Sequence, residues 1–106
     1  MVSIEKQPWE AFFVAGDFAA ELATGETLDD GETGTEGNHI TAMDNAGNDV
    51  SDTFLDQDTL SIGVSTLTIR CRGGSEAASP YKIDFRCVTT DANKYEVEMR
   101  VKVRDR

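Results

Sequence analysis

The last third of the chain alternates between apolar and charged side chains. From residue 95 to residue 104, every odd position is apolar or aromatic and every even position is charged. A period of two over this length predicts a strand with one face on a core and the other in water. Residues 81–87 alternate in the same way, and the polar segment 89–94 between the two runs has the length of a hairpin loop. The two runs therefore predict an antiparallel pair.

Five further segments are apolar enough to form short strands. In the run 66–72, Leu67, Ile69 and Cys71 share one face, and Gly73 and Gly74 then allow a tight reversal. The other segments are 10–14, 39–43, 50–55 and 57–66, of which 39–43 and 50–55 read as the two strands of a hairpin. Phe18 and Leu22, four positions apart, predict one short helical turn over 18–22.

This spacing of short strands predicts an all-β fold, an antiparallel β-sandwich formed by residues 1–106 as a single domain. A small open barrel is the alternative. The inward positions predict this core: Phe12, Val14, Phe18, Leu22, Leu67, Ile69, Tyr81, Ile83, Phe85, Val97, Met99, Val101 and Val103.

The charge of the chain excludes some classes of partner. Twenty acidic against ten basic residues give a net charge of −10, which argues against nucleic acid and against an anionic membrane surface. The longest apolar run, residues 11–15, is too short for a membrane span or a signal peptide, so we expect no signal peptide and two reduced, buried thiols at Cys71 and Cys87. Residues 1–58 contain fourteen acidic residues and one basic residue, whereas 59–106 contain six acidic and nine basic residues.

No spacing of chemistry-bearing residues predicts catalysis. The carboxylates form no favoured pair, and His39 is the single histidine, so we expect no enzymatic activity and no cofactor. Asp44, Asn48 and Asp49 gather oxygen ligands of the kind that calcium prefers, although the register of an EF-hand is missing. The residue preferences of a hairpin turn explain the same three residues without a metal.

Three residues are candidates for contact with a protein partner. Trp9 follows Pro8 in a charged stretch, where it either caps an open end of the core or anchors a partner. Glu32 and Glu36 belong to the segment 29–38, whose three glycines and four acids predict an exposed loop.

Several short motifs follow one another along the chain in a definite order. The opening carries Lys6-Gln7-Pro8, Glu10, Asp17-Phe18 and the segment 22–28, and the middle carries 40–47 followed by Asp49-Val50. The last part runs through residues 67–69, 73–74, 81–90, 95–96 and 101–104. This order resembles that of a family of small bacteriophage and prophage proteins, which are described as fiber–tail adaptors with an immunoglobulin-like fold. The loops 29–38 and 75–79 depart from the family pattern.

The resemblance implies an immunoglobulin-like sandwich and a non-enzymatic role as a structural component of a phage or prophage particle. Its partners would be other tail or fiber proteins, and its location the bacterial cytoplasm during assembly and then the virion. The alternative function is an immunoglobulin-like binding module for carbohydrate or calcium. Because so acidic a chain repels its own copies, we expect a monomer or a weak dimer when it is isolated.

Overall fold

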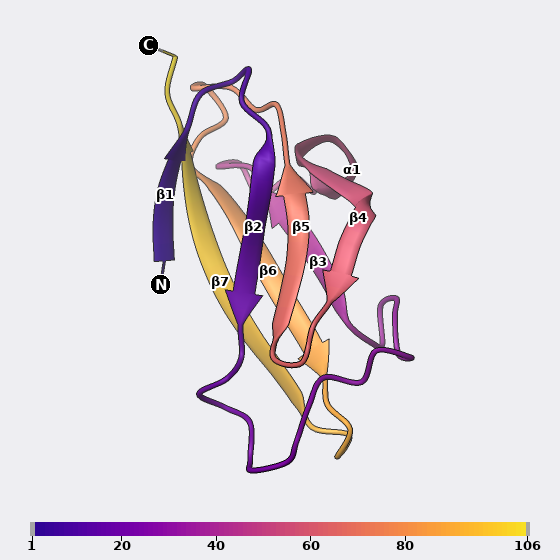
Figure 1. Ribbon diagram of the computed structural model, residues 1–106. Coiled ribbons are helices and arrows are strands. Elements are labelled where there is room, and N and C mark those ends of the chain that lie inside the picture. Colours follow the sequence, from indigo (N-terminus) through magenta and orange to yellow (C-terminus); the bar gives the residue numbers. More distant parts are fainter. Residues whose placement is uncertain (1, 106) are drawn as a thin grey trace.

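Seven strands and one short helix make up the regular structure of residues 2–105, which the computed structural model describes (Figure 1). In chain order they are β1 (Val2–Lys6), β2 (Phe12–Asp17), β3 (His39–Met43), α1 (Ser51–Phe54), β4 (Leu55–Ile62), β5 (Thr66–Cys71), β6 (Tyr81–Val88) and β7 (Lys94–Val103).

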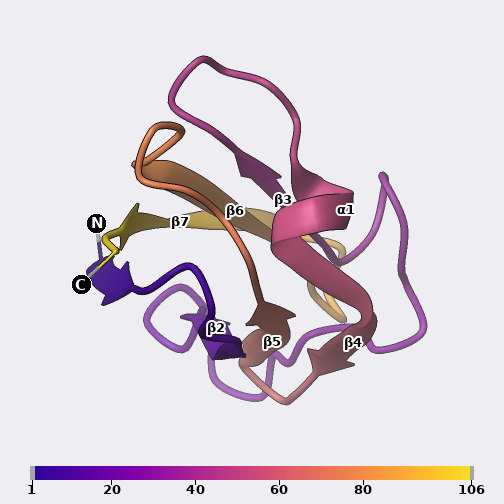
Figure 2. The ribbon, with the colours of Figure 1, turned by 90° about the horizontal axis from the view of Figure 1, so that it is seen from above.

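The strands form two sheets that pack face to face. One sheet has the order β1-β7-β6-β3 and the other the order β2-β5-β4. β1 pairs parallel to β7, and the other pairs are antiparallel. The view from above shows the two sheets as separate layers (Figure 2). The all-β sandwich is therefore confirmed, and the open-barrel alternative is wrong.

The molecule is elongated, with principal extents of 44 × 22 × 22 Å. We call the end where β1, β3, β5 and β7 finish the upper end, and the end where β2, β4 and β6 finish the lower end (Figure 1). The predicted pair of C-terminal strands is confirmed, since Tyr81 lies opposite Val101 and Cys87 opposite Tyr95.

Two predicted elements are wrong. Residues 18–22 form no helix but a single turn, closed by the bond from Glu21 N–H to the Phe18 carbonyl. The Asp17 carboxylate accepts the Ala19 N–H at 2.9 Å, and such a local side-chain bond competes with helix formation. The expected strand 50–55 contains helix α1 instead. Phe54 and Leu55 are both buried, and alternating strand geometry cannot place adjacent side chains on one face, whereas a helical turn leading into β4 can.

The core lies between the two sheets. The predicted positions are buried there, apart from Phe12, Leu22 and Val97, which are partly buried against it. Leu28, Ile40, Ala42, Phe54 and Leu55 belong to the core as well.

The two cysteines are buried and free, as expected. Cys71 lies on β5 and Cys87 on β6, so they belong to opposite sheets. Burial raises the pKa of both thiols above its ordinary value, which makes the reactive thiolate scarcer.

One close contact brings the two sheets together near the edge formed by β2. Gly16 lies on β2, and a Cβ atom at this position would be 2.5 Å from Cγ of the fully buried Phe85. The ring of Phe85 therefore packs directly on the β2 backbone, which only glycine permits.

We expect Gly16→Ala to lower the free energy of unfolding by about 1–3 kcal/mol, because the added methyl group overpacks the core. Gly31→Ala is the matched control: its Cβ would meet nothing closer than an Asp29 side-chain oxygen at 3.5 Å. The control should change stability by no more than about 0.5 kcal/mol. Urea unfolding measures both, and equal stability of the two variants would contradict the contact.

Candidate interaction surfaces

Trp9 lies on a tight turn at the upper end and is 94% exposed. The turn comprises residues 7–10 and is closed by the bond from Glu10 N–H to the Gln7 carbonyl at 3.1 Å. The carboxylate of Glu10 in turn accepts the Gln7 N–H at 2.6 Å. The interpretation of Trp9 as a cap of the core is therefore wrong. A partner anchor remains the prediction.

A buried lysine stabilises this turn through hydrogen bonds. Lys6 is 2% exposed, and its ammonium group donates to the carbonyls of Gln7 at 2.8 Å, Gly73 at 2.6 Å and Pro8 at 3.4 Å. Desolvation lowers the pKa of Lys6, and the charge is compensated by these carbonyl dipoles. Because the ammonium ties the turn to the β5–β6 loop, Trp9 is presented on ordered backbone.

Glu32 and Glu36 lie at the other end of the molecule, on the exposed loop 29–38. Glu36 forms an ion pair with Lys94 at 3.3 Å, and both side chains are well exposed. The predicted exposed loop is confirmed, except that its last two residues are buried.

The buried Asn38 gives the loop 29–38 its shape. Its side-chain amide donates to the carbonyls of Asp29 and Glu32 at 2.7 and 2.8 Å, and its oxygen accepts the Val88 N–H at 2.9 Å. All three polar positions at this side chain are used inside the protein. The acidic loop is thus held against the end of β6, and its backbone cannot be shortened without losing these bonds.

Glu26 makes a second connection at the lower end. Its carboxylate accepts bonds from the Thr89 hydroxyl at 2.5 Å, the Asn93 amide at 2.8 Å and the Ala23 N–H at 2.9 Å. These bonds, led by that of Thr89, lower the pKa of Glu26. The carboxylate ties the segment after β2 to the β6–β7 hairpin.

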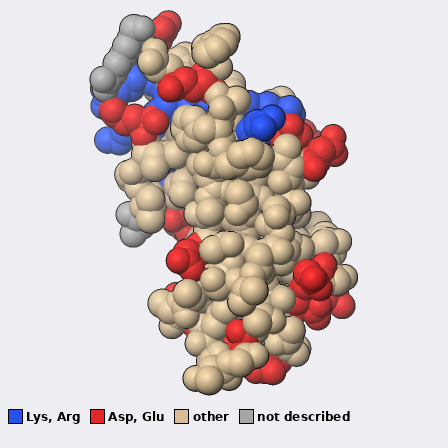
Figure 3. Space-filling model, viewed as in Figure 1, with Lys and Arg blue, Asp and Glu red and all other residues tan. Residues whose placement is uncertain are grey.

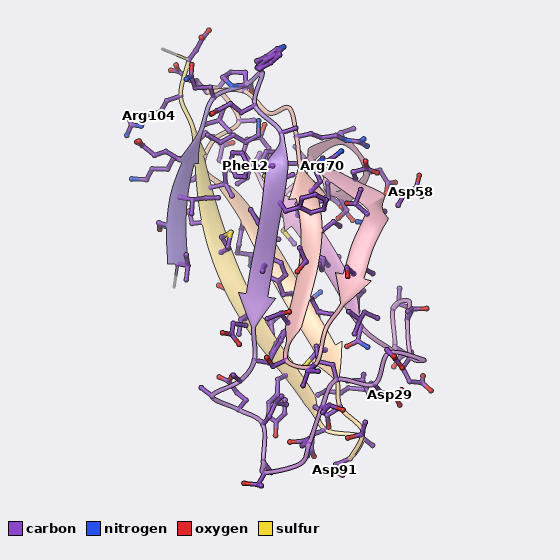
Figure 4. All side chains as sticks on the ribbon, in the orientation of Figure 1. Phe12, Asp29, Asp58, Arg70, Asp91 and Arg104 are labelled. Atoms are coloured by element: carbon purple, nitrogen blue, oxygen red, sulfur yellow. The ribbon has the colours of Figure 1, made fainter. Side chains whose placement is uncertain are left out.

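Trp9 and the two glutamates therefore do not form one site. They lie at opposite ends of the long axis, because the turn 7–10 precedes β2 at the upper end and the loop 29–38 precedes β3 at the lower end. In the view of Figure 3, Lys and Arg gather at the upper end together with acids, whereas the lower half shows Asp and Glu. Figure 4 places Arg104 at the upper end and Asp29 and Asp91 at the lower end.

The calcium candidates lie in the turn after β3. Asp44 accepts the N–H groups of Ala46 and Asn48, each at 3.0 Å, and Asp49 accepts the N–H of Ser51 at 2.9 Å. The bond from the Asn48 N–H contributes most to a lowered pKa of Asp44, and the Ser51 hydroxyl contributes most to that of Asp49. Turn geometry accounts for these residues, and the calcium interpretation stays a prediction. Among residues 2–105, no group of three histidine, cysteine or acidic side chains could hold a metal ion.

The outer face of the four-stranded sheet carries the charges of β6 and β7. Arg86 pairs with Glu96 at 2.6 Å, directly across the β6–β7 pair. Asp84 is 2% exposed here, between Lys82 and Arg86, each 3.6 Å from its Oδ2 atom, while its Oδ1 atom has no hydrogen-bond partner. Desolvation raises the pKa of Asp84.

His39 lies at the start of β3, with its Nδ1 atom 2.9 Å from the Gly37 carbonyl.

Sequence reasoning missed Lys6, Glu26, Asn38 and Asp84. Polar residues of these types are usually exposed, so no local pattern marked them as buried.

No protein-family model matches the chain, and no curated protein matches it. Within the described part of the chain, no helix is long and apolar enough to cross a membrane.

We expect the hydrogen bonds of Glu26 to make part of the stability depend on pH. Its pKa in the folded protein is lowered from an ordinary value of 4.5, so its contribution is fully present above that value and is lost as the pH falls through the folded pKa. Glu26→Gln and Thr89→Val should therefore both be less stable at neutral pH and lose less stability than the wild type on acidification. Urea unfolding at a series of pH values tests this, and three parallel profiles would contradict it.

Proposed function

We propose that this chain is an immunoglobulin-like structural component of a phage or prophage particle, where it joins tail or fiber proteins through protein–protein contacts. The observation that carries the contact role is the full exposure of Trp9 on a braced turn. Removing a tryptophan from water is strongly favourable, and tryptophans are enriched among residues that dominate binding energy. The assignment to a phage or prophage particle is based on the resemblance of the ordered motifs to the family of small phage proteins.

The order of the strands supports the immunoglobulin-like assignment. In immunoglobulin constant domains, strands B, E and D share one sheet and strands C, F and G share the other. Here the second, fifth and fourth strands form one sheet, and the third, sixth and seventh lie together in the other. The first strand departs from that plan, because it pairs with β7 rather than with β2.

A tyrosine at the start of β6 gives further support. The hydroxyl of Tyr81 accepts the backbone N–H of Ser75 at 3.0 Å, six residues upstream in the β5–β6 loop. Immunoglobulin-like domains carry a comparable tyrosine corner near the start of strand F. The ring of Tyr81 also stacks on Phe54, with centroids 4.1 Å apart.

The two ends of the sandwich support a connecting role. An adaptor must contact two components, and this chain presents an aromatic turn at one end and an acidic loop at the other. The chemistry of the two ends differs, so each would select a different kind of partner.

The first test concerns Trp9. An epitope-tagged chain, expressed in the host that encodes it, should copurify with purified particles, and Trp9→Ala should weaken its incorporation by about 2 kcal/mol or more, roughly thirtyfold. Val64→Ala is the control, since Val64 is 71% exposed at the lower end. Both variants should fold as stably as the wild type. Absence of the wild-type chain from particles would refute the particle role, and normal incorporation of Trp9→Ala would refute the anchor.

The second test concerns the acidic loop. Replacing both Glu32 and Glu36 by Gln should weaken incorporation at low salt and have little effect at high salt, because exposed charges are screened. Substitution is preferable to deletion, since the Glu32 carbonyl accepts the Asn38 side chain. Asp58→Asn combined with Asp105→Asn removes the same charge as a control, since Asp58 lies on β4 and Asp105 follows β7 at the upper end. Equal effects of the two double variants would show that net charge alone matters.

A further inference from the structure

A groove of about 460 Å³ opens along one side of the sandwich, away from both ends. It lies between β2 and the lower part of β7, beyond the N-terminal end of β1. Phe85, Val97 and Met99 line it together with Val2, which is 57% exposed. The charged residues along it are Asp17 and Glu98, both acidic, of which Glu98 also pairs with Lys82 at 3.9 Å. The groove is thus apolar inside and acidic at its rim.

The backbone of β2 faces this groove with open hydrogen-bonding groups. β2 is the edge strand of its sheet and pairs with β5 on one side. The Phe18 N–H donates to the Ser65 carbonyl across this pair, and hydrogen-bonded positions alternate along antiparallel strands. The N–H and carbonyl groups of Phe13, Ala15 and Asp17 therefore point away from β5, toward the free edge.

Two of the three other edge strands, β3 and β4, are protected. At β3, the Ser51 hydroxyl accepts the Ala42 N–H and the Gln57 amide donates to the Ile40 carbonyl. β4 is irregular between Asp56 and Ser61 and carries acidic side chains there. Bulges, charges and covering segments are the usual means of blocking strand addition. The middle of β2 consists of the small residues Ala15 and Gly16, and the charged residue of this strand, Asp17, lies at its end.

We infer that β2 accepts an extended segment of a partner protein as an additional strand. Main-chain bonds to Phe13, Ala15 and Asp17 would give affinity, and alternate apolar side chains would enter the groove over Val97 and Met99. The carboxylate of Asp17 favours lysine or arginine among the remaining side chains of that segment, whereas that of Glu98 already pairs with Lys82. The segment is therefore extended, apolar at alternate positions and basic.

A second copy of this chain fits the groove less well than such a segment. Two copies joined through β2 would bring the acidic rims together, and each copy carries a net charge of −10. Like charges placed opposite one another across paired strands are destabilising. The occupant is accordingly a different chain of opposite charge.

The inference can be tested with the full chain and synthetic peptides. The probe is an eight-residue peptide of alternating lysine and valine, compared with the same peptide carrying glutamate for lysine. In an NMR titration, the lysine peptide should shift the amide signals of Ala15 and Asp17 and slow their hydrogen exchange. It should bind about twofold more tightly than the glutamate peptide, as expected for one exposed ion pair at Asp17.

Matched variants distinguish peptide binding at β2 from contacts made by the other candidate surfaces. Asp17→Asn should remove the preference for lysine, since the ion pair that carries it is lost. Asp58→Asn, on the opposite edge strand of the same sheet, should leave the preference unchanged. Trp9→Ala should also bind the peptide normally, so failure of the aromatic anchor is distinguishable from failure of strand addition. Unshifted β2 amides, equal binding of both peptides, or self-association of the wild type through β2 would each overturn the inference.

Discussion

The packing of Phe85 on the backbone of Gly16 is the contact on which the arrangement of the two sheets depends. A fully buried aromatic ring contributes a large apolar surface, and here it meets bare backbone rather than a second side chain. β2 can therefore approach the four-stranded sheet closely at this point. The same approach leaves Val97 and Met99 beside the free edge of β2. One missing side chain thus sets both the spacing of the sheets and the position of the groove.

Buried polar side chains hold in place the loops that strand packing alone does not fix. Lys6 joins the turn 7–10 to Gly73, Asn38 joins the acidic loop to Val88, and Glu26 joins the segment after β2 to Thr89. Each polar group is fully enclosed by partners, which offsets the cost of taking it out of water. Ordering the loops before binding removes part of the entropy that a partner would otherwise have to offset. The fold therefore presents its ends as rigid surfaces.

The sequence predicts the strands best where alternation is long and unbroken, as in β6 and β7. It fails for β1, whose five residues end in a lysine that no local pattern marks as buried. It also fails for α1, because the adjacent apolar residues Phe54 and Leu55 look like part of a strand until the core to which both belong is known. Among the candidate contact residues, exposure of the loop 29–38 follows from its composition, whereas the exposure of Trp9 does not. The hydrogen bonds of the buried polar residues cannot be predicted from local sequence patterns, because their partners are distant in sequence. Lys6 and Gly73 are 67 positions apart, and Glu26 and Thr89 are 63 apart.

The strand directions convert the uneven charge along the sequence into an uneven charge along the molecule. β5 and β7 both run to the upper end, so Arg70, Arg72 and Arg104 come together there although they are distant in sequence. These bases meet acids such as Glu5, which pairs with Arg104 at 2.9 Å, and the upper end is of mixed charge. The bases nearer the lower end, Arg86 and Lys94, are each paired with a glutamate. Among the described residues, acids of the lower end such as Asp30 and Glu32 have no basic side chain within ion-pair distance, and their field would attract a basic partner to that end before contact. A gradient of this kind orients an elongated module during association, which a uniformly acidic surface cannot do.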